Sequence, residues 1–326
     1  MMNAIEVHDL TKVYSVKTRK KNARWFSAFQ SETHHVTAVK EINFSIPEKA
    51  IVGLIGPNGA GKSTVIKMLC GILHPTSGSI KVLNYIPHAQ RQRLNKNIST
   101  IFGQKPQLWY HLPPTETFEV MKHLYQIDLK TFTDNYQYLR EMLDIGAFED
   151  KPVRKLSLGQ RIRCEIVASL LHDPKLVLMD EPTIGLDLVT KIAIRQIVKK
   201  INQEKNTTFV ITSHDINDIE KMCEQLIVIN SGTIVFNGDI NTLKENYATH
   251  KYIHIITDDR DTLVNSLPTI PIEQKSTNEF VIRLDKQDHL DTVVTQLMQL
   301  DEKAVFTVHE SNLEDIIHKI YVSNGE

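Results

Sequence analysis

The sequence of 326 residues predicts an α/β fold with a mainly parallel sheet, followed by a smaller α+β domain. Short apolar runs typical of strands alternate with segments whose apolar residues recur at helical spacing, and this alternation predicts a parallel sheet covered by helices on both faces. After about Leu243 the order changes to β-α-β-β-α-β, the split arrangement of ferredoxin-like domains. We therefore predict two domains, over residues 1–240 and 241–326.

The first domain begins with two short strands, separated by a hydrophilic stretch over 17–35 that indicates an insertion (about 15–37) or a long loop. A β-branched run over 51–55 is followed by a glycine-rich turn and then by apolar residues at helical spacing. The alternation continues to about residue 236. The predicted strands are 5–13, 39–46, 51–55, 176–179, 208–212, 226–229 and 233–236, and the predicted helices are 62–73, 115–127, 135–143, 160–171, 189–202 and 216–223.

The second domain is expected to have a core of its own and carries no recognisable catalytic cluster. We therefore expect it to regulate the first domain or to stabilise a dimer. Its predicted strands are 251–257, 269–274, 279–285 and 304–309, and its predicted helices are 259–267, 289–300 and 312–321.

Composition excludes several classes of protein. Lys plus Arg total 38 against 39 for Asp plus Glu, so the broad basic field of a dedicated nucleic-acid binder is missing and no nucleic acid is expected as a partner. The three cysteines are far apart in the sequence and form no ligand cluster, which favours a reduced, cytosolic setting. No apolar run approaches the ~18 residues of a membrane span, so we expect any membrane role to depend on a partner.

A glycine-rich turn between the predicted strand 51–55 and the helix after it matches G-x-x-x-x-G-K-[ST]. Such a turn closes backbone N–H groups around a phosphate at a helix N-terminus, while the lysine neutralises phosphate charge and the hydroxyl binds Mg²⁺. The alternative is a glycine turn that merely opens a core helix. The motif is Gly56-Pro57-Asn58-Gly59-Ala60-Gly61-Lys62-Ser63, and Thr64 follows it.

Two acids, Asp180 and Glu181, follow the apolar strand over 176–179. The carboxyl end of such a strand is where α/β sheets bind ligands. Asp180 is predicted to hold Mg²⁺, and Glu181 to orient or deprotonate the water that attacks the γ-phosphate. Taken alone, acids after a strand are most often solvated loop residues.

The segment Leu156-Ser157-Leu158-Gly159-Gln160 could be a serine-capped helix start. Its position between the phosphate loop and the two acids also resembles the signature sequence of ABC transporter cassettes, although the family's commonest form has Gly where this chain has Leu158. The resemblance implies that Ser157 and Gly159, with Gln160 beside them, contact nucleotide.

Four further residues fall in the family's order across roughly residues 4–240. Tyr14 resembles the aromatic residue that stacks on adenine, and Gln104 resembles the Q-loop glutamine that contacts Mg²⁺ or the attacking water. Asp187, in Gly185-Leu186-Asp187, resembles the loop that meets the opposite subunit, and His214 resembles the switch histidine on the γ-phosphate. Each also has a plain structural reading: a strand tyrosine, a polar loop residue, a bare turn and a structural histidine.

The resemblance as a whole implies a P-loop NTPase with a RecA-like core, an antiparallel β subdomain and a helical signature subdomain over about 105–172. It implies hydrolysis of ATP with Mg²⁺, with Lys62, Gln104, Glu181 and His214 as catalytic residues and Ser63, Gln104 and Asp180 at the metal. Because one cassette's signature completes another's phosphate site, a second cassette is implied. Permease subunits on separate chains and a peripheral location on the cytoplasmic face of the membrane are implied as well.

The stretch 102–113 and the appended second domain look like the bacterial branch of drug and polysaccharide exporters; an importer ATPase, or a soluble ABC ATPase acting on ribosomes or DNA, is the alternative. Trp109 and Tyr110 follow the Q-loop and suit a groove that receives a permease helix, or else pack within the helical subdomain. Basic and aromatic residues within 17–35 suit an anionic lipid surface or a permease loop, or else form a solvated hairpin or loop.

Overall fold

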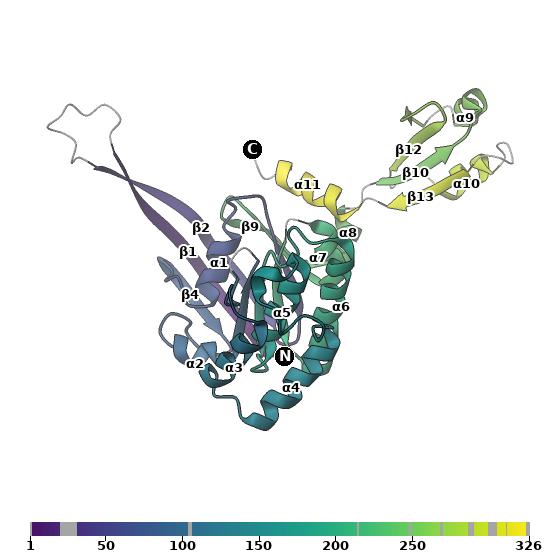
Figure 1. Cartoon of the computed structure of the whole chain (residues 1–326). Coiled ribbons are helices and arrows are strands. Elements are labelled where there is room, and N and C mark those ends of the chain that lie inside the picture. The colour runs from purple at the N-terminus through teal and green to yellow at the C-terminus, as the bar shows by residue number, and fades with distance from the viewer. Residues whose placement is uncertain are drawn as a thin grey trace. The chain divides into compact units, whose positions relative to one another are not determined.

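The computed structural model describes residues 2–19, 31–103, 106–213, 215–247, 250–267, 270–285, 290–298, 305–310 and 312–323. The chain divides into two compact units, Met1–Gly238 and Asp239–Glu326 (Figure 1). The boundary predicted from the sequence lay after residue 240, whereas the structure divides between Gly238 and Asp239. The second unit then begins with the helix α8 (Ile240–Tyr247), which was not predicted.

The first unit contains a six-stranded sheet with the order β5-β6-β7-β3-β8-β9. The four pairings from β5 to β8 are parallel, as the alternation of strands and helices predicts. β3 and β7 are buried along their whole length, which explains their unbroken apolar runs. The strands are β3 (Ile51–Ile55), β5 (Ile98–Phe102), β6 (Leu176–Asp180), β7 (Thr208–Thr212), β8 (Gln225–Asn230) and β9 (Thr233–Asp239).

A second, antiparallel sheet has the order β2-β1-β4, with β1 (Asn3–Arg19), β2 (Ser31–Pro47) and β4 (Ser77–Val82). The predicted strands 5–13 and 39–46 are too short, because pairing continues outward to Arg19↔Ser31. The outer part of this hairpin carries exposed residues such as Val16 and Val36, so it shows no apolar alternation. Residues 20–30, with most of the basic and aromatic side chains noted above, lie outside the described residues.

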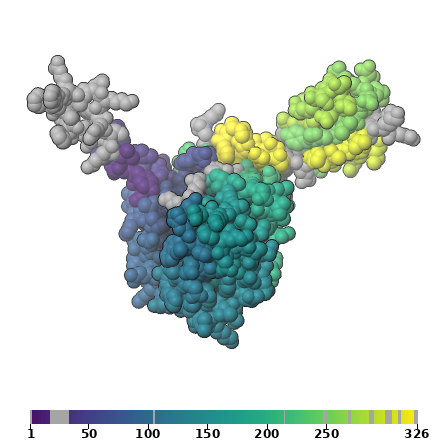
Figure 2. All heavy atoms as spheres, viewed as in Figure 1, coloured from purple at the N-terminus to yellow at the C-terminus, as the bar shows by residue number. Residues whose placement is uncertain are grey.

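Helices of the first unit cover the sheets and connect them. α1 (Lys62–Leu69) contacts β2, β4 and β6, so its buried side chains join one hydrophobic core with both sheets. α5 (Leu158–Leu170) packs on α3 (Pro114–Leu124), on α4 (Leu129–Met142) and on β5. In the space-filling view the purple and blue N-terminal segments gather on one side of this unit and the teal segments on the other (Figure 2). The remaining helices are α2 (Arg91–Asn95), the short 3₁₀ helix η2 (Val153–Lys155), α6 (Leu188–Lys205) and α7 (Ile216–Met222).

The second unit contains a four-stranded antiparallel sheet with the order β11-β12-β10-β13. Its core combines strand residues such as Ile253, Phe280 and Ile282 with Leu263 and Val293 from two helices. α8 packs against α11. The elements after α8 are β10 (His250–Ile256), α9 (Arg260–Ser266), β11 (Ile272–Gln274), β12 (Glu279–Asp285), α10 (Leu290–Leu297), β13 (Val305–Glu310) and α11 (Leu313–Ser323).

None of the helices described is both long and apolar enough to cross a lipid bilayer. Cys70, Cys164 and Cys223 are buried and unbridged. Burial raises the pKa of the Cys164 thiol to about 12, so this cysteine stays protonated and unreactive at neutral pH.

Candidate nucleotide-binding site

The loop between β3 and α1 is held in place by its neighbours and needs glycine at two positions. A Cβ on Gly56 would lie 2.2 Å from the carbonyl oxygen of Ile229, and a Cβ on Gly61 would lie 2.5 Å from that of Ala38. Gly61 also has a φ of 109°, which L side chains rarely adopt. The loop therefore brings its backbone N–H groups to the N-terminus of α1, where an anion is favoured.

Lys62, the first residue of α1, folds back onto this loop. Its Nζ donates to the carbonyl oxygens of Gly56 at 2.7 Å and Pro57 at 3.1 Å. Burial lowers the pKa of Lys62, and the negative charges of Glu181 and Asp180 oppose that shift. The structure thus holds a buried ammonium group within the loop, where it can meet a phosphate group.

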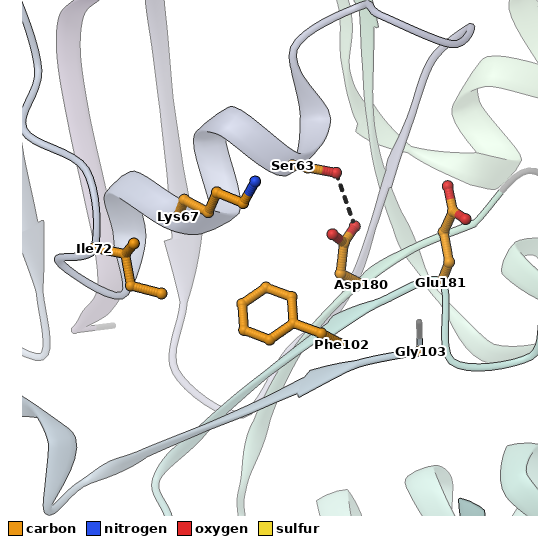
Figure 3. Close-up of a pocket in the computed structure, with 7 residues that line it drawn as sticks. All are labelled: Ser63, Lys67, Ile72, Phe102, Gly103, Asp180 and Glu181. Carbon is orange, nitrogen blue, oxygen red and sulfur yellow. Dashed lines mark hydrogen bonds between the residues drawn. The ribbon is translucent and has the colours of Figure 1, made fainter. Parts of the chain in front are cut away.

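Asp180 ends β6 beside two hydroxyl groups. Its Oδ1 accepts a hydrogen bond from Ser63 Oγ at 3.3 Å (Figure 3). The same oxygen accepts a second hydrogen bond from Thr212 Oγ1 at 2.6 Å. Thr212 was not among the predicted site residues, although it ends the strand before position 214. β6 and β7 are parallel neighbours with Asp180 opposite Thr212, so their ends had to meet at one edge of the sheet.

Glu181 has the left-handed backbone conformation, with a φ of 56°. Such a conformation costs a non-glycine residue about 1–3 kcal/mol and persists only where the surroundings enforce it. Here the backbone N–H of Glu181 donates to the carbonyl oxygen of Thr212 at 3.2 Å and to its Oγ1 at 3.0 Å. Gly103 fits closely against the same turn, since a Cβ on it would lie 2.3 Å from the carbonyl oxygen of Glu181.

A cavity of about 410 Å³ lies between α1 and the ends of β5 and β6 (Figure 3). Lys67 borders this cavity and was not predicted; it lies one turn of α1 after Ser63, so helical spacing could have indicated it. Gln104 follows the lining residue Gly103 in the chain but lies outside the described residues. The lining residues are Ser63, Lys67, Ile72, Phe102, Gly103, Asp180 and Glu181.

The donor set at Ser63 and Asp180 suits Mg²⁺. This ion prefers oxygen ligands and usually keeps several waters, binding through one or two protein groups together with substrate phosphates. A hydroxyl and a carboxylate 3.3 Å apart beside a phosphate-type loop match that pattern. Within the described ranges no cluster of three or more His, Cys, Asp or Glu side chains forms a closed metal site.

Tyr14 and Thr64 are brought together. The Tyr14 hydroxyl lies 3.5 Å from Thr64 Oγ1, and the Lys12 ammonium group lies 5.4 Å from the centre of the Tyr14 ring. The tyrosine ring therefore lies beside the first turn of α1, as a residue flanking a nucleotide on this loop would have to.

Ser157, Gly159, Gln160 and Asp187 are not among the residues that line the 410 Å³ cavity. Ser157 Oγ accepts a hydrogen bond from the Gln160 backbone N–H at 3.2 Å, and the Gln160 side chain accepts one from the Ser157 N–H at 3.0 Å. Ser157 is thus the N-cap of α5, as the simpler reading held, and it is also exposed. Asp187 caps α6 in the same way.

His214, predicted to contact the γ-phosphate, lies outside the described residues; its neighbours Ser213 and Asp215 line a second cavity of about 170 Å³. This cavity also contacts Glu181 and Gly185. The described segments that flank position 214 therefore lie next to Glu181.

Trp109 and Tyr110 are about half exposed, at 48% and 58%. They are therefore not packed inside the helices around them. The Trp109 backbone N–H donates to Thr117 Oγ1 at 3.4 Å, and the Tyr110 carbonyl oxygen accepts from the Arg154 N–H at 3.0 Å, so the backbone is fixed while the rings face outward.

Comparison with known proteins finds similarity to one family over the part of the chain that carries these features. Residues 39–184 match the family model described as ABC transporter. The chain is 28% identical over 217 residues to the ABC transporter ATP-binding protein NatA of Bacillus subtilis, covering 67% of this chain and 88% of that protein. It is 33% identical over 216 residues to the methionine import ATP-binding protein MetN 1 of Acinetobacter baylyi, covering 65% of this chain and 60% of that protein.

Two solved structures are similar in fold and sequence. A dimeric ATP-binding cassette in a post-hydrolysis state bound to ADP and Pi is 25% identical, has a TM-score of 0.59, and covers 72% of this chain and 98% of that chain. The structure of cbiO1 from Clostridium perfringens, part of the ABC transporter complex cbiONQ, is 25% identical with a TM-score of 0.56, covering 73% and 88%. The predicted α/β cassette fold of the first unit is confirmed.

Proposed function

From the premise that this chain contains an ABC transporter ATP-binding cassette, we propose that it is the subunit of an ABC transporter that binds Mg-ATP and hydrolyses it to ADP and phosphate. The observation that carries the proposal is the arrangement of Ser63, Asp180 and Glu181 around one cavity at the glycine-rich loop. Ser63 and the two acids come from separate segments of the chain, and phosphoryl transfer needs this combination of a phosphate cradle, a metal ligand pair and a carboxylate.

In the proposed mechanism the backbone N–H groups of 58–61 surround the β-phosphate, and Lys62 exchanges its two loop carbonyl partners for phosphate oxygens. Ser63 and Asp180 would hold Mg²⁺, which would neutralise charge on the phosphates of the nucleotide. Glu181 orients the attacking water and accepts its proton. The strained backbone of Glu181 and its contact with Gly103 hold that carboxylate at the cavity.

Ser157, Gly159 and Gln160 do not line this cavity, which supports a role toward a second cassette rather than toward the nucleotide of their own chain. We infer that two cassettes close over two nucleotides and that Asp187, Gln104 and His214 act within that closed state. Tyr14 is inferred to stack on the adenine ring.

For direction and partners, we propose export through permease subunits on separate chains, with the cassette bound at the cytoplasmic face of the membrane. The stretch 102–113 supports an exporter-type branch by resemblance. The second candidate is import, favoured by the relative named as a methionine import ATP-binding protein. The second unit, Asp239–Glu326, has a hydrophobic core of its own and is proposed to be regulatory or dimer-stabilising.

Glu181→Gln tests the hydrolytic role, because it keeps the shape of the side chain and removes the carboxylate. The variant is expected to bind Mg-ATP with the parent's affinity and to lose most turnover, on the order of a hundredfold or more. Phosphate release and binding of a fluorescent ATP analogue measure the two properties, and Glu141→Gln on exposed α4 is the matched control. Hydrolysis by Glu181→Gln at the parent's rate would show that another residue serves the water.

A further inference from the structure

The first turn of α6 joins two of the segments discussed above. Asp187, the N-cap, accepts hydrogen bonds from the backbone N–H of Thr190 at 2.9 Å and from its hydroxyl at 2.8 Å. The same hydroxyl lies against Gly159 of α5, where an added Cβ would be only 2.8 Å away. The loop 183–187 and the start of α5 therefore both contact the first turn of α6, through Thr190.

The next residue, Lys191, extends this connection to α7. Its Nζ donates to Asp215 Oδ2 at 2.6 Å and lies 3.5 Å from Asp218 Oδ2. Asp215 Oδ1 in turn accepts from the backbone N–H of Asp218 at 3.2 Å and so caps α7. One carboxylate thus performs two tasks, a helix cap with one oxygen and an ion pair with the other.

This ion pair is anchored in a buried network rather than at the surface. Asp218 is fully buried, and its Oδ1 accepts from Arg195 Nε at 2.9 Å and from Arg195 NH2. A buried carboxylate is costly to leave without a counter-charge, so Asp218 needs both cations near it. α6 and α7 pack on each other along this network.

The charges of the pair are stabilised by the contact itself. The hydrogen bond to Asp215 raises the pKa of Lys191. Burial would raise the pKa of Asp215, but the hydrogen bonds from Lys191 and from the Asp218 N–H together lower it. Both groups are therefore ionised at neutral pH.

The pair borders the same cavity as Glu181. Lys191 and Asp215 line the 170 Å³ cavity together with Glu181, Gly185 and Ser213. The Asp215 N–H also donates to Ser213 Oγ at 3.0 Å, so the backbone on both sides of position 214 is held. The ion pair therefore lies where the loop 183–187, the end of β7 and Glu181 meet.

We propose that Lys191 and Asp215 are positioning residues for ATP hydrolysis, whose ion pair keeps the loop 183–187 in register with the end of β7 and thereby with Glu181. This inference rests on the proposed ATPase function. It assigns the two residues no contact with nucleotide, and so their effect must appear in turnover and not in ATP affinity.

Steady-state hydrolysis by the full chain tests the proposal through Lys191→Met, which keeps side-chain length, and Asp215→Asn, which keeps the helix cap. Each is expected to lower kcat about tenfold while KM for ATP changes less than about twofold. Lys191→Arg restores most of the rate. The double variant loses no more than Lys191→Met alone, since Lys191→Met already removes the ion pair with Asp215 together with the contact to Asp218. Lys200→Met, which removes an exposed ion pair from the same helix, is the matched control and keeps the parent's rate.

Amide hydrogen exchange gives a readout that does not depend on turnover. Mg-ATP is expected to slow exchange in 183–190 and 213–219 of the parent, and Lys191→Met is expected to lose this protection in both segments together. Parental kcat with retained protection in Lys191→Met, or losses that multiply in the double variant, would overturn the inference alone. A parent chain that binds no ATP would instead overturn the proposed function.

Discussion

Thr212 donates a hydrogen bond from its hydroxyl to Oδ1 of Asp180, across two neighbouring parallel strands, with the two oxygens 2.6 Å apart. The same hydroxyl oxygen accepts from the backbone N–H of Glu181 at 3.0 Å. A fully buried threonine thus orients both acids proposed for metal binding and water activation.

Thr212→Val removes this hydroxyl with little change in shape. We expect kcat to fall about tenfold and the Mg²⁺ concentration for half-maximal activity to rise, because Asp180 loses a charge-assisted hydrogen bond. The free energy of unfolding should fall by about 1–3 kcal/mol, the cost of leaving buried partners less satisfied. ATPase assays over a Mg²⁺ titration and urea denaturation measure both effects. Thr212→Ser, which keeps the hydroxyl, is the control, and equal losses in the two variants would contradict the role given to the hydroxyl.

Glu165 of α5 is buried, at 2% exposed, and its Oε1 lies 3.7 Å from Arg161 Nε. Burial raises the pKa of this carboxyl from 4.5 to about 7, against the opposing effect of Arg161. The folded protein therefore binds the Glu165 proton more tightly than the unfolded chain. The resulting stability is fully present below about pH 4.5 and is lost as the pH rises through about 7.

Glu165→Gln should remove this dependence, because a carboxamide does not ionise. We expect the free energy of unfolding of the variant, relative to the parent, to rise between pH 5 and pH 8. Urea denaturation of both proteins at several pH values measures the difference, in which the contributions of unchanged groups cancel. A difference that is constant across this range would show that burial does not perturb Glu165.

The meeting of the glycine-rich loop with Asp180 and Glu181 could be predicted because its signals are local. The glycine-rich loop and the two acids each occupy one short stretch with a strand before it, and parallel strand ends must meet at one edge of a sheet. Thr212 could have been predicted in the same way, because it ends the strand that lies beside Asp180.

Other features depend on packing between distant segments and left no local signal. In the sequence, Lys191 and Asp215 look like the charged residues found on any exposed helix surface. Only the packing of α6 on α7 brings them together. A solvated hairpin within 17–35 was one of the predicted alternatives, but the strands 5–13 and 39–46 were predicted too short, because strands exposed on both faces have no apolar alternation. Glu165 was missed because an acid in an apolar helix gives no sign of whether it is buried.

Trp109→Ala tests the proposed docking of a permease next to residues 104–108. The ring is 48% exposed and is absent from the lining of the nucleotide cavity, so its loss should spare ATP affinity. We expect co-purification of the permease from detergent-solubilised membranes to fall severalfold, as for an exposed aromatic anchor. Leu129→Ala, an exposed apolar residue at the start of α4, is the control. Unchanged recovery of the permease with Trp109→Ala would remove the docking role.

The shared-site arrangement predicts that Glu181→Gln accumulates as an ATP-dependent dimer, because the unhydrolysed γ-phosphate keeps bridging Lys62 of one subunit and Ser157 of the other. Ser157→Arg in that background should abolish the dimer. The substitution also removes the N-cap of α5, which costs about 1 kcal/mol, so a variant with the same local cost is needed. Asp128→Arg removes the N-cap of α4 and should leave the dimer intact. Size-exclusion chromatography with light scattering, with Mg-ATP and with ADP, measures the mass. A dimer that forms equally well with ADP, or despite Ser157→Arg, would mean that closure depends on neither the γ-phosphate nor Ser157.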